Sequence, residues 1–292
     1  MIRKILGLIR FSHTVFALPF ALLAAAMAVH ENLQSAPPRS LRWQDVLGIV
    51  LCMVLARAAA MGFNRVVDVE FDRDNPRTAG RHLPSGELPV IVAKLLVFVC
   101  TFGFMFSTLL FVPYSRIPVY TSLPVLLFLF AYSFAKRFTA LSHFWLGAAL
   151  MLAPLGAWFA LRPEFEWAPF ILGFAVMLWV AGFDIIYACQ DAEFDRILGL
   201  HSVPASLGVT GALHVAAACH GGMILLLLIL PNVFPAFGWI YITGVLLIAA
   251  LLAYEHSLVQ PDDLQNVNRA FFHVNAVVSI GLMIAGGLDL FV

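Results

Sequence analysis

The sequence carries little charge for its length. Lys, Arg, Asp and Glu make up 12% of its 292 residues, whereas hydrophobic residues make up 62%. A soluble domain usually carries about 25% charged residues, so this chain cannot cover a water-facing surface. The 17 basic and 17 acidic residues balance, and no basic stripe indicates a nucleic-acid partner. The composition predicts an integral membrane protein surrounded by membrane lipid, and it argues against nucleic-acid binding.

Cysteine is also scarce. The four cysteines are scattered in apolar stretches without metal-ligand spacing, so we expect them to pack as small apolar side chains. The histidines likewise show no ligand spacing. For His13, His82 and His201, which lie at a helix start and in polar loops, we expect hydrogen-bonded structural roles, and the alternative is that one or more of them reach the acidic site.

Apolar runs of about 20 residues, the length that crosses a bilayer, recur along the whole chain. They predict an all-α fold, a bundle of about nine transmembrane helices forming one polytopic domain over residues 1–292. The start resembles a signal peptide, but the many further runs favour an uncleaved first helix. The expected spans are 12–30, 43–66, 89–112, 117–135, 141–161, 167–190, 209–230, 234–255 and 268–291.

The first concentration of charge follows the second apolar run. Residues four apart share a helix face, so Asn64, Asp68 and Asp72 should form a column, with Arg57 two turns earlier on the same face. Glu70 should point away. Carboxylates placed this closely repel one another unless a cation lies among them.

A second acidic segment follows the sixth run. Asp191 and Asp195 are four apart, Tyr187 precedes Asp191 by four residues and Asp184 precedes it by seven, while Glu193 should point away. An even number of spans separates the two acidic segments, so both should lie at the same membrane face. Most Lys and Arg residues also fall on that side if the N-terminus is inside, which predicts that this face is cytoplasmic.

Oxygen ligands of this kind suit Mg²⁺, which usually keeps positions open for phosphate oxygens. Arg77 and Arg81 follow the first segment, and Lys136 ends the fourth run; such basic residues suit a diphosphate. Taken alone, Lys136 and its neighbour Arg137 better fit residues that anchor a helix at the membrane surface. Tyr132, four residues before it, should share its helix face. A polyprenyl diphosphate, with a charged head and an apolar tail, fits such a membrane site.

The spacing resembles that of the UbiA family of intramembrane prenyltransferases over essentially the whole chain. The family's first motif, N-D-x-x-D-x-x-x-D, corresponds to Asn64-Arg65-x-x-Asp68-x-x-x-Asp72, with Arg65 in place of the usual aspartate but pointing away from Asn64 around the helix. The second, D-x-x-x-D, corresponds to Asp191-x-x-x-Asp195, and a Tyr-x-x-x-Lys motif to Tyr132 and Lys136.

Further features resemble one branch of that family. The Asn-Arg start of the first motif, Leu83-Pro84-Ser85-Gly86 and the opening segment 10–20 are similar to 4-hydroxybenzoate polyprenyltransferase-like members. Some members of this branch serve menaquinone synthesis by the futalosine route.

The resemblance implies a reaction and a role for each residue. A polyprenyl group would pass from polyprenyl diphosphate to an aromatic quinone precursor, either 4-hydroxybenzoate for ubiquinone or a dihydroxynaphthoate for menaquinone, in the plasma (inner) membrane. Asp68, Asp184 and Asp191 would be catalytic, with Asp184 accepting a proton. Arg57 would face the acceptor, or instead pair with an acid of the other motif. Mg²⁺ would be held by Asn64, Asp68, Asp72, Asp191 and Asp195, and diphosphate by Arg77, Arg81, Lys136 and Tyr187.

Two other classes of function fit parts of the pattern. A membrane cation transporter also needs intramembrane acids, but transporter sites usually lie near the bilayer midplane, whereas these acids end helices beside basic loops. A purely structural membrane protein leaves the repeated spacing unexplained. Both considerations favour an enzyme.

Overall fold

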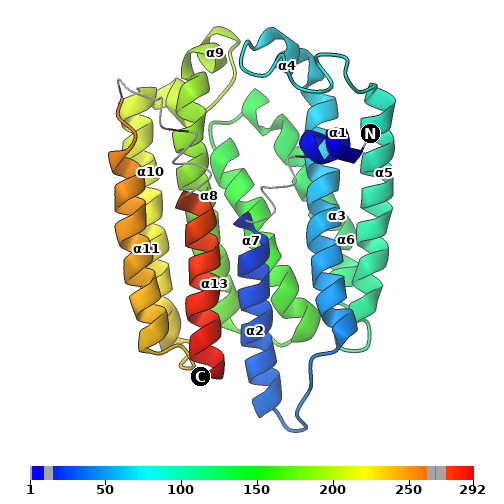
Figure 1. Cartoon of the computed structure of the whole chain (residues 1–292), viewed down its shortest axis with the longest axis vertical. Helices are drawn as coiled ribbons and strands as arrows, with labels where there is room; N and C mark the ends of the chain where they lie inside the picture. The colour runs from blue at the N-terminus through cyan, green and yellow to red at the C-terminus, as the bar shows by residue number, and fades with distance from the viewer. Residues whose placement is uncertain (1, 10–15, 262–266, 268–273) are drawn as a thin grey trace. The chain divides into compact units, whose positions relative to one another are not determined.

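The regular structure of the chain is helical. The computed structural model describes residues 2–9, 16–261, 267 and 274–292 (Figure 1), and nine helices within these ranges contain 15 residues or more. The expected all-α class is therefore confirmed. These nine helices are α2 (Leu18–Gln34), α3 (Trp43–Val67), α5 (Val90–Ser107), α6 (Ile117–Ala131), α7 (Ser142–Leu161), α8 (Trp167–Ala188), α10 (Val203–Ile229), α11 (Trp239–Ser257) and α13 (Asn275–Phe291).

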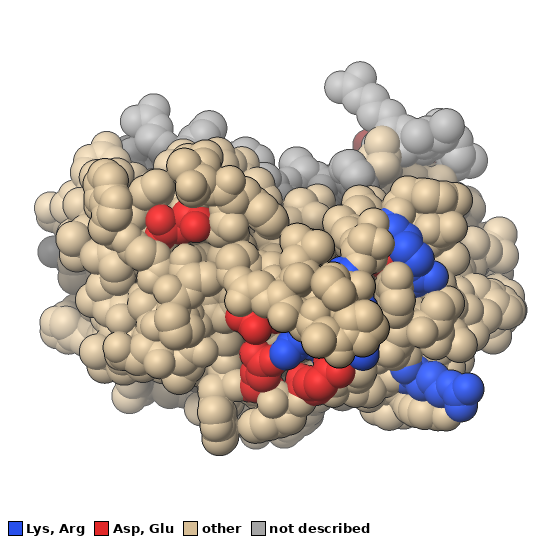
Figure 2. Space-filling view, turned by 90° about the horizontal axis from the view of Figure 1, so that it is seen from below, with Lys and Arg blue, Asp and Glu red and all other residues tan. Residues whose placement is uncertain are grey.

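Most of these helices are suited to a membrane. Seven helical segments of the described chain are long and apolar enough to cross a bilayer, and α13 is apolar but shorter. Large apolar side chains also point outward, as Ile91, Phe98 and Phe106 of α5 do at 68%, 60% and 67% exposure. A helix that is apolar on both its packed and its outer face belongs in lipid, so the protein is an integral membrane protein. Figure 2 shows one end of the molecule, where charged side chains form only a few small groups.

Several helix ends differ from those expected. The expected spans 12–30 and 268–291 include residues 12–15 and 268–273, which lie outside the described residues. Helix α10 begins six residues early, because Ser202 caps it by accepting a hydrogen bond from Ala205 N–H (3.3 Å). The chain then kinks at Gly208, whose φ of 72° suits glycine. Helix α11 begins only at Trp239, because Pro231, Pro235 and Gly238 interrupt the preceding segment.

The chain divides into two compact units, Met1–Thr14 with Leu41–Phe134 and Val15–Ser40 with Ala135–Val292. In the first unit, α3 packs against α5 and α6. Its core includes Ala58, Cys100 and Leu126. Helix α3 begins where Asp45 accepts a hydrogen bond from Arg42 N–H (3.0 Å), and the side-chain hydrogen bond to Asp45 raises the pKa of the Arg42 guanidinium.

In the second unit, α8 packs between α7 and α10, and α2 and α13 lie side by side. Helices α7 and α8 approach closely at Gly147, where an added Cβ would collide with the Met177 carbonyl. Polar side chains also cross the packed interior. Trp179 donates to Asn275 Oδ1 (2.8 Å), and Asn275 Nδ2 donates to Glu255 Oε1 (3.0 Å). All three are fully buried, so these hydrogen bonds join α8, α13 and α11.

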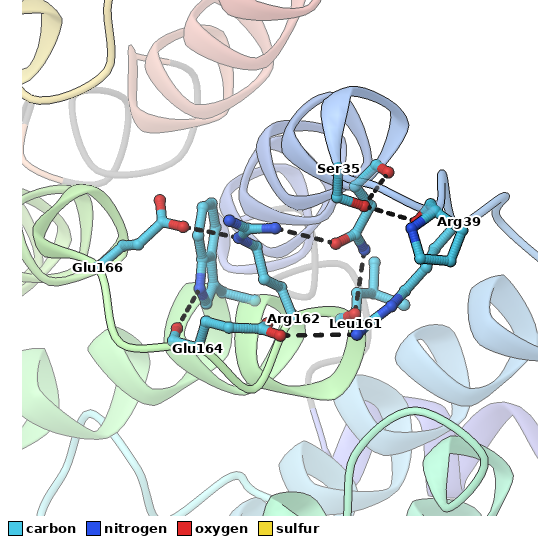
Figure 3. Close-up of polar contacts among 9 residues, drawn as sticks. Ser35, Arg39, Leu161, Arg162, Glu164 and Glu166 are labelled. Carbon is cyan, nitrogen blue, oxygen red and sulfur yellow. Dashed lines mark hydrogen bonds and ion pairs between the residues drawn. The ribbon is translucent and has the colours of Figure 1, made fainter.

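A group of polar contacts fixes the last turn of α2 in the same unit (Figure 3). Asn32 Nδ2 donates to the Leu161 carbonyl (3.1 Å), and Arg162 donates to Asn32 Oδ1 (3.3 Å) and to Glu166 Oε1 (2.7 Å). Asn32 is buried, and the contacts satisfy both ends of its amide. The turn between α7 and α8 therefore holds the end of α2.

Candidate active site

The first acidic motif lies where α3 gives way to the short helix α4 (Val69–Asp74). Asp68 stands between the two helices with φ −98° and ψ 8°. Even so, Asp68 N–H donates to the Asn64 carbonyl (2.9 Å) and Asp72 N–H to the Asp68 carbonyl (2.8 Å). The helical hydrogen-bond pattern between residues four apart is thus kept across the junction of α3 and α4. The Asn64 amide also donates to Asp68 Oδ2 (2.7 Å), which leaves its carbonyl oxygen as the atom able to face a cation.

Two arginines neutralise Asp72. Arg81 NH1 lies 2.6 Å from Asp72 Oδ1, and Arg65 NH1 lies 3.8 Å from Asp72 Oδ2. Arg65 is buried and its Nε donates to the Leu8 carbonyl (3.5 Å), which ties α1 (Ile2–Leu8) to the motif. The sequence predicted only that Arg65, which replaces the usual aspartate of the motif, points away from Asn64. In the structure, the long Arg65 side chain also reaches Asp72.

The connection after α4 folds on its own polar side chains. Asn75 Oδ1 accepts from Arg77 N–H (2.9 Å), an Asx turn, and Thr78 Oγ1 donates to the Asp72 carbonyl (2.9 Å). The Asn-Pro-Arg-Thr sequence thereby returns the chain toward α4. This return brings Arg81 to Asp72.

The second acidic motif has the same construction in the second unit. Helix α8 ends at Ala188, a 3-10 turn (Cys189–Asp191) follows, and the short helix α9 (Ala192–Ile197) begins after Asp191. Asp195 is buried, and Lys136 Nζ lies 3.2 Å from its Oδ2. The Lys136 carbonyl accepts from His201 N–H (2.7 Å). Lys136 therefore contacts both α9 and the loop that follows it.

The expected shared face of Tyr132 and Lys136 is wrong. Residues 132–137 form a 3-10 helix rather than an α-helix. With three residues per turn, positions three apart align and positions four apart do not. The motif's spacing therefore does not place its phenol and ammonium groups on one helix face.

Asp184 has a partner that the sequence did not indicate. His143 Nδ1 lies 2.6 Å from Asp184 Oδ2, although 41 residues separate the two. Backbone Val203 N–H approaches the other imidazole nitrogen, Nε2, at 3.4 Å. Sequence spacing gave no signal for this pair, because α7 and α8 are brought together only by tertiary packing.

The remaining predicted residues lie on the same elements. Arg57 is half-buried in α3, inside its apolar span, and Tyr187 lies in the last turn of α8. Arg77 lies in the loop after α4. His13 is outside the described residues, His82 lies in the first loop, where its carbonyl accepts from Leu88 N–H (2.9 Å), and His201 makes the backbone bond to Lys136.

Oxygen donors fit a divalent cation in part. Within the described ranges, no group of three or more His, Cys, Asp and Glu side chains is gathered closely enough to hold a metal ion. One buried atom nevertheless suits a cation: Asp72 Oδ2 accepts no hydrogen bond from the described residues. The hard oxygens of Asn64, Asp68 and Asp72 match the preference of Mg²⁺.

A helical membrane protein with two such acidic motifs and basic partners has the features of an enzyme that handles an anionic, lipid-soluble substrate. Residues 13–277 match the model of the UbiA prenyltransferase family. The chain belongs to this family, and it is therefore a prenyltransferase. The prediction of an enzyme is confirmed.

Curated relatives and solved structures agree with this assignment. The chain is 29% identical over 245 residues to the 4-hydroxybenzoate octaprenyltransferase of Saccharophagus degradans, covering 83% of this chain and 80% of the relative. The Citrobacter koseri protein of that name is 29% identical over 239 residues, covering 80% and 78%. The apo structure of a UbiA homolog from Aeropyrum pernix K1 matches with TM-score 0.78 at 27% identity, covering 95% and 96%. A UbiA homolog from Archaeoglobus fulgidus bound to GPP and Mg²⁺ shares the fold, with TM-score 0.72 at 19% identity, covering 99% and 100%.

Proposed function

We propose that the enzyme transfers a polyprenyl group from polyprenyl diphosphate to 4-hydroxybenzoate and requires Mg²⁺. The names of its relatives support the acceptor, and the homolog bound to GPP and Mg²⁺ supports the donor and the metal. One observation carries the proposal: the last aspartate of each motif is paired with a basic side chain, Asp72 with Arg81 and Asp195 with Lys136. Acids and bases arranged in this way suit a cation and a diphosphate together.

The proposed metal ligands are Asn64, Asp68 and Asp72 from the first motif and Asp191 and Asp195 from the second. Bound Mg²⁺ would neutralise charge on the diphosphate and so make it a better leaving group. In the free protein, Arg81 and Arg65 compensate the buried Asp72 carboxylate, and Lys136 compensates the buried Asp195 carboxylate. These basic side chains are then already beside the acids when the substrate arrives.

The proposed diphosphate ligands are Arg77, Arg81, Lys136 and Tyr187. Arginine can bind phosphate oxygens in a bidentate manner, whereas lysine acts as a point charge. Once a metal cation compensates Asp72 and Asp195, Arg81 and Lys136 can turn their charge to the phosphates. In the free protein, the ion pairs therefore hold the Arg81 and Lys136 side chains in position while leaving them able to bind phosphate later.

We propose that Arg57 binds the carboxylate of the acceptor and that Asp184 is the base. An ionisable residue inside an apolar span, as Arg57 is, indicates function by default. In the reaction, the allylic carbon–oxygen bond breaks and diphosphate leaves with the electron pair. The ring carbon beside the hydroxyl forms the new carbon–carbon bond. Asp184 takes the proton from that ring carbon, and the released electron pair restores the aromatic ring.

The proposed setting is the plasma (inner) membrane, with both acidic motifs on the cytoplasmic side. The Lys and Arg distribution supports this orientation. A dihydroxynaphthoate is the second candidate acceptor, because Arg65 and the Asn-Arg motif resemble the branch that includes menaquinone enzymes.

An acceptor screen tests the proposal. Membranes containing the protein receive Mg²⁺, a polyprenyl diphosphate and either 4-hydroxybenzoate or a dihydroxynaphthoate, and prenylated product is measured by mass spectrometry. We expect product from 4-hydroxybenzoate, none after chelation by EDTA, and recovery when Mg²⁺ is restored. Product from the naphthoate alone would mean that the acceptor is a dihydroxynaphthoate rather than 4-hydroxybenzoate. No product from either acceptor, with folded protein, would refute the proposal.

A further inference from the structure

His143 makes contacts with two elements besides its own helix. It lies in the first turn of α7 and is fully buried. Its Nδ1 lies 2.6 Å from Asp184 Oδ2 on α8, and its Nε2 lies 3.4 Å from the backbone nitrogen of Val203, the first residue of α10. Asp184 itself keeps 20% of its side chain exposed, against 0% for His143. A buried group therefore holds a carboxylate that is still accessible.

The contacts determine which imidazole nitrogen carries the proton. A backbone N–H can only donate, so Nε2 must accept the hydrogen bond from Val203. The neutral imidazole then carries its hydrogen on Nδ1, which donates to Asp184. The carboxylate is thereby fixed through Oδ2, and its other oxygen is the one that remains for a substrate.

Helix packing determines the position of the pair. Gly147 lies one turn after His143, and Met177 lies two turns before Asp184. Because an added Cβ at Gly147 would collide with the Met177 carbonyl, glycine permits the close approach of α7 and α8. That approach brings the imidazole within hydrogen-bonding distance of the carboxylate.

We infer that His143 is a positioning residue for prenyl transfer, which holds Asp184 in the orientation needed to take the ring proton. The inference rests on the proposed function. In that step the ring C–H bond breaks, the proton passes to Asp184, and the electron pair returns to the ring. His143 donates its hydrogen bond throughout and does not itself exchange a proton with the substrate. A misplaced base slows this step, and a small displacement can reduce a rate by about 100-fold.

Two substitutions separate the two hydrogen bonds of His143. In His143→Asn, the side-chain N–H₂ occupies the region of Nδ1 and can still donate to Asp184. In His143→Gln, the amide reaches the region of Nε2, where its oxygen can accept from Val203 N–H. We expect Gln to lower kcat about 10- to 100-fold with little change in KM for the prenyl diphosphate, and Asn to recover most of that loss. His214→Gln, an exposed histidine of α10, is the control.

A deuterium isotope effect gives a readout that a structural role would not move. The acceptor is the one that the parent enzyme prenylates, with and without deuterium at the ring carbons beside the hydroxyl. We expect a small effect on kcat for the parent, because a well-placed base makes ring deprotonation fast compared with loss of diphosphate. In His143→Gln, deprotonation slows and the effect should increase clearly. In His143→Asn it should return toward the parent value.

Thermal unfolding in detergent accompanies each assay, so that turnover is compared only between folded proteins. Parent-like kcat and isotope effect in folded His143→Gln would overturn the inference. So would equal losses in the Gln and Asn variants without any change in isotope effect. If His143→Gln does not fold, a large loss of kcat in folded His143→Asn overturns it. Failure of the parent to prenylate any acceptor would instead refute the proposed function.

Discussion

Asp68 and Asp191 adopt nearly the same backbone conformation, with φ −98° and ψ 8° for the first and φ −105° and ψ 3° for the second. Each residue joins a long helix or its final turn to a helix of six residues. This sparsely populated region of φ and ψ often contains active-site residues. The two acidic motifs are therefore the same local structure formed twice, in two units and from different flanking sequences.

Replacing either Asp68 or Asp191 should abolish most activity without unfolding the protein. We expect Asp68→Ala and Asp191→Ala to lower turnover by about 100-fold or more, since one group that stabilises developing charge is typically worth that much. Turnover is measured as prenylated acceptor, and folding by gel filtration in detergent.

Neighbouring acids provide matched controls for these variants. Glu70 and Glu193 are exposed and lie two residues after Asp68 and Asp191, respectively. Glu70→Ala and Glu193→Ala should retain turnover near that of the parent. An equal loss in the aspartate and glutamate variants would show that the total negative charge of the two segments matters, rather than the particular positions of Asp68 and Asp191.

Lys136→Gln should weaken binding of the prenyl diphosphate. It removes the charge beside Asp195, and a charge-assisted hydrogen bond is worth about 1.5–3 kcal/mol. We expect KM for the diphosphate to rise about 10- to 100-fold in steady-state assays. Arg137→Gln, at an exposed neighbouring position, should leave KM close to the parent value. An unchanged KM in Lys136→Gln would mean that Lys136 has only a structural role.

Sequence periodicity was sufficient to predict the helical class and the positions of most helices. It was also sufficient to single out both acidic segments, because spacing along one helix is a local property. Periodicity could not reveal the Asp184–His143 pair, whose members lie 41 residues apart on different helices. It also could not show that Arg65 reaches Asp72, since that depends on side-chain conformation. At Tyr132, the four-residue rule failed because the helix tightens to a 3-10 turn.

Arg65→Gln should lower the Mg²⁺ concentration needed for half-maximal activity. The Arg65 guanidinium lies 3.8 Å from Asp72 Oδ2. Its positive charge should therefore repel Mg²⁺ and weaken binding of the metal at Asp72. A tenfold change corresponds to roughly 1.4 kcal/mol, which one nearby charge readily supplies at an effective dielectric constant of about 20. The measurement is activity across an Mg²⁺ titration. Lys94→Gln, an exposed lysine of α5, is the control, and a higher Mg²⁺ requirement in Arg65→Gln would contradict the prediction.

Asn275→Ala should destabilise the second unit. Asn275 accepts from Trp179 and donates to Glu255, all of them buried, and hydrogen bonds between membrane helices contribute about 0.6–2 kcal/mol each. We expect a lower thermal unfolding midpoint in detergent and unchanged KM for the diphosphate in the folded enzyme. Asn232→Ala, at an exposed position, should leave the midpoint unaltered. If both variants have the same midpoint as the parent, the buried network does not stabilise the fold.

Helix α2 has a place in the chain that differs from its place in the fold. It is made before α3, yet it packs with α7, α8 and α13, and the side-chain amide of its Asn32 is hydrogen-bonded to Leu161 and Arg162. During synthesis, α2 must therefore wait in the membrane until its last partner helix has been inserted. A fragment ending at Phe134 would carry α2 without those partners, and one beginning at Ala135 would lack it. We expect co-expression of the two fragments to rebuild the second unit.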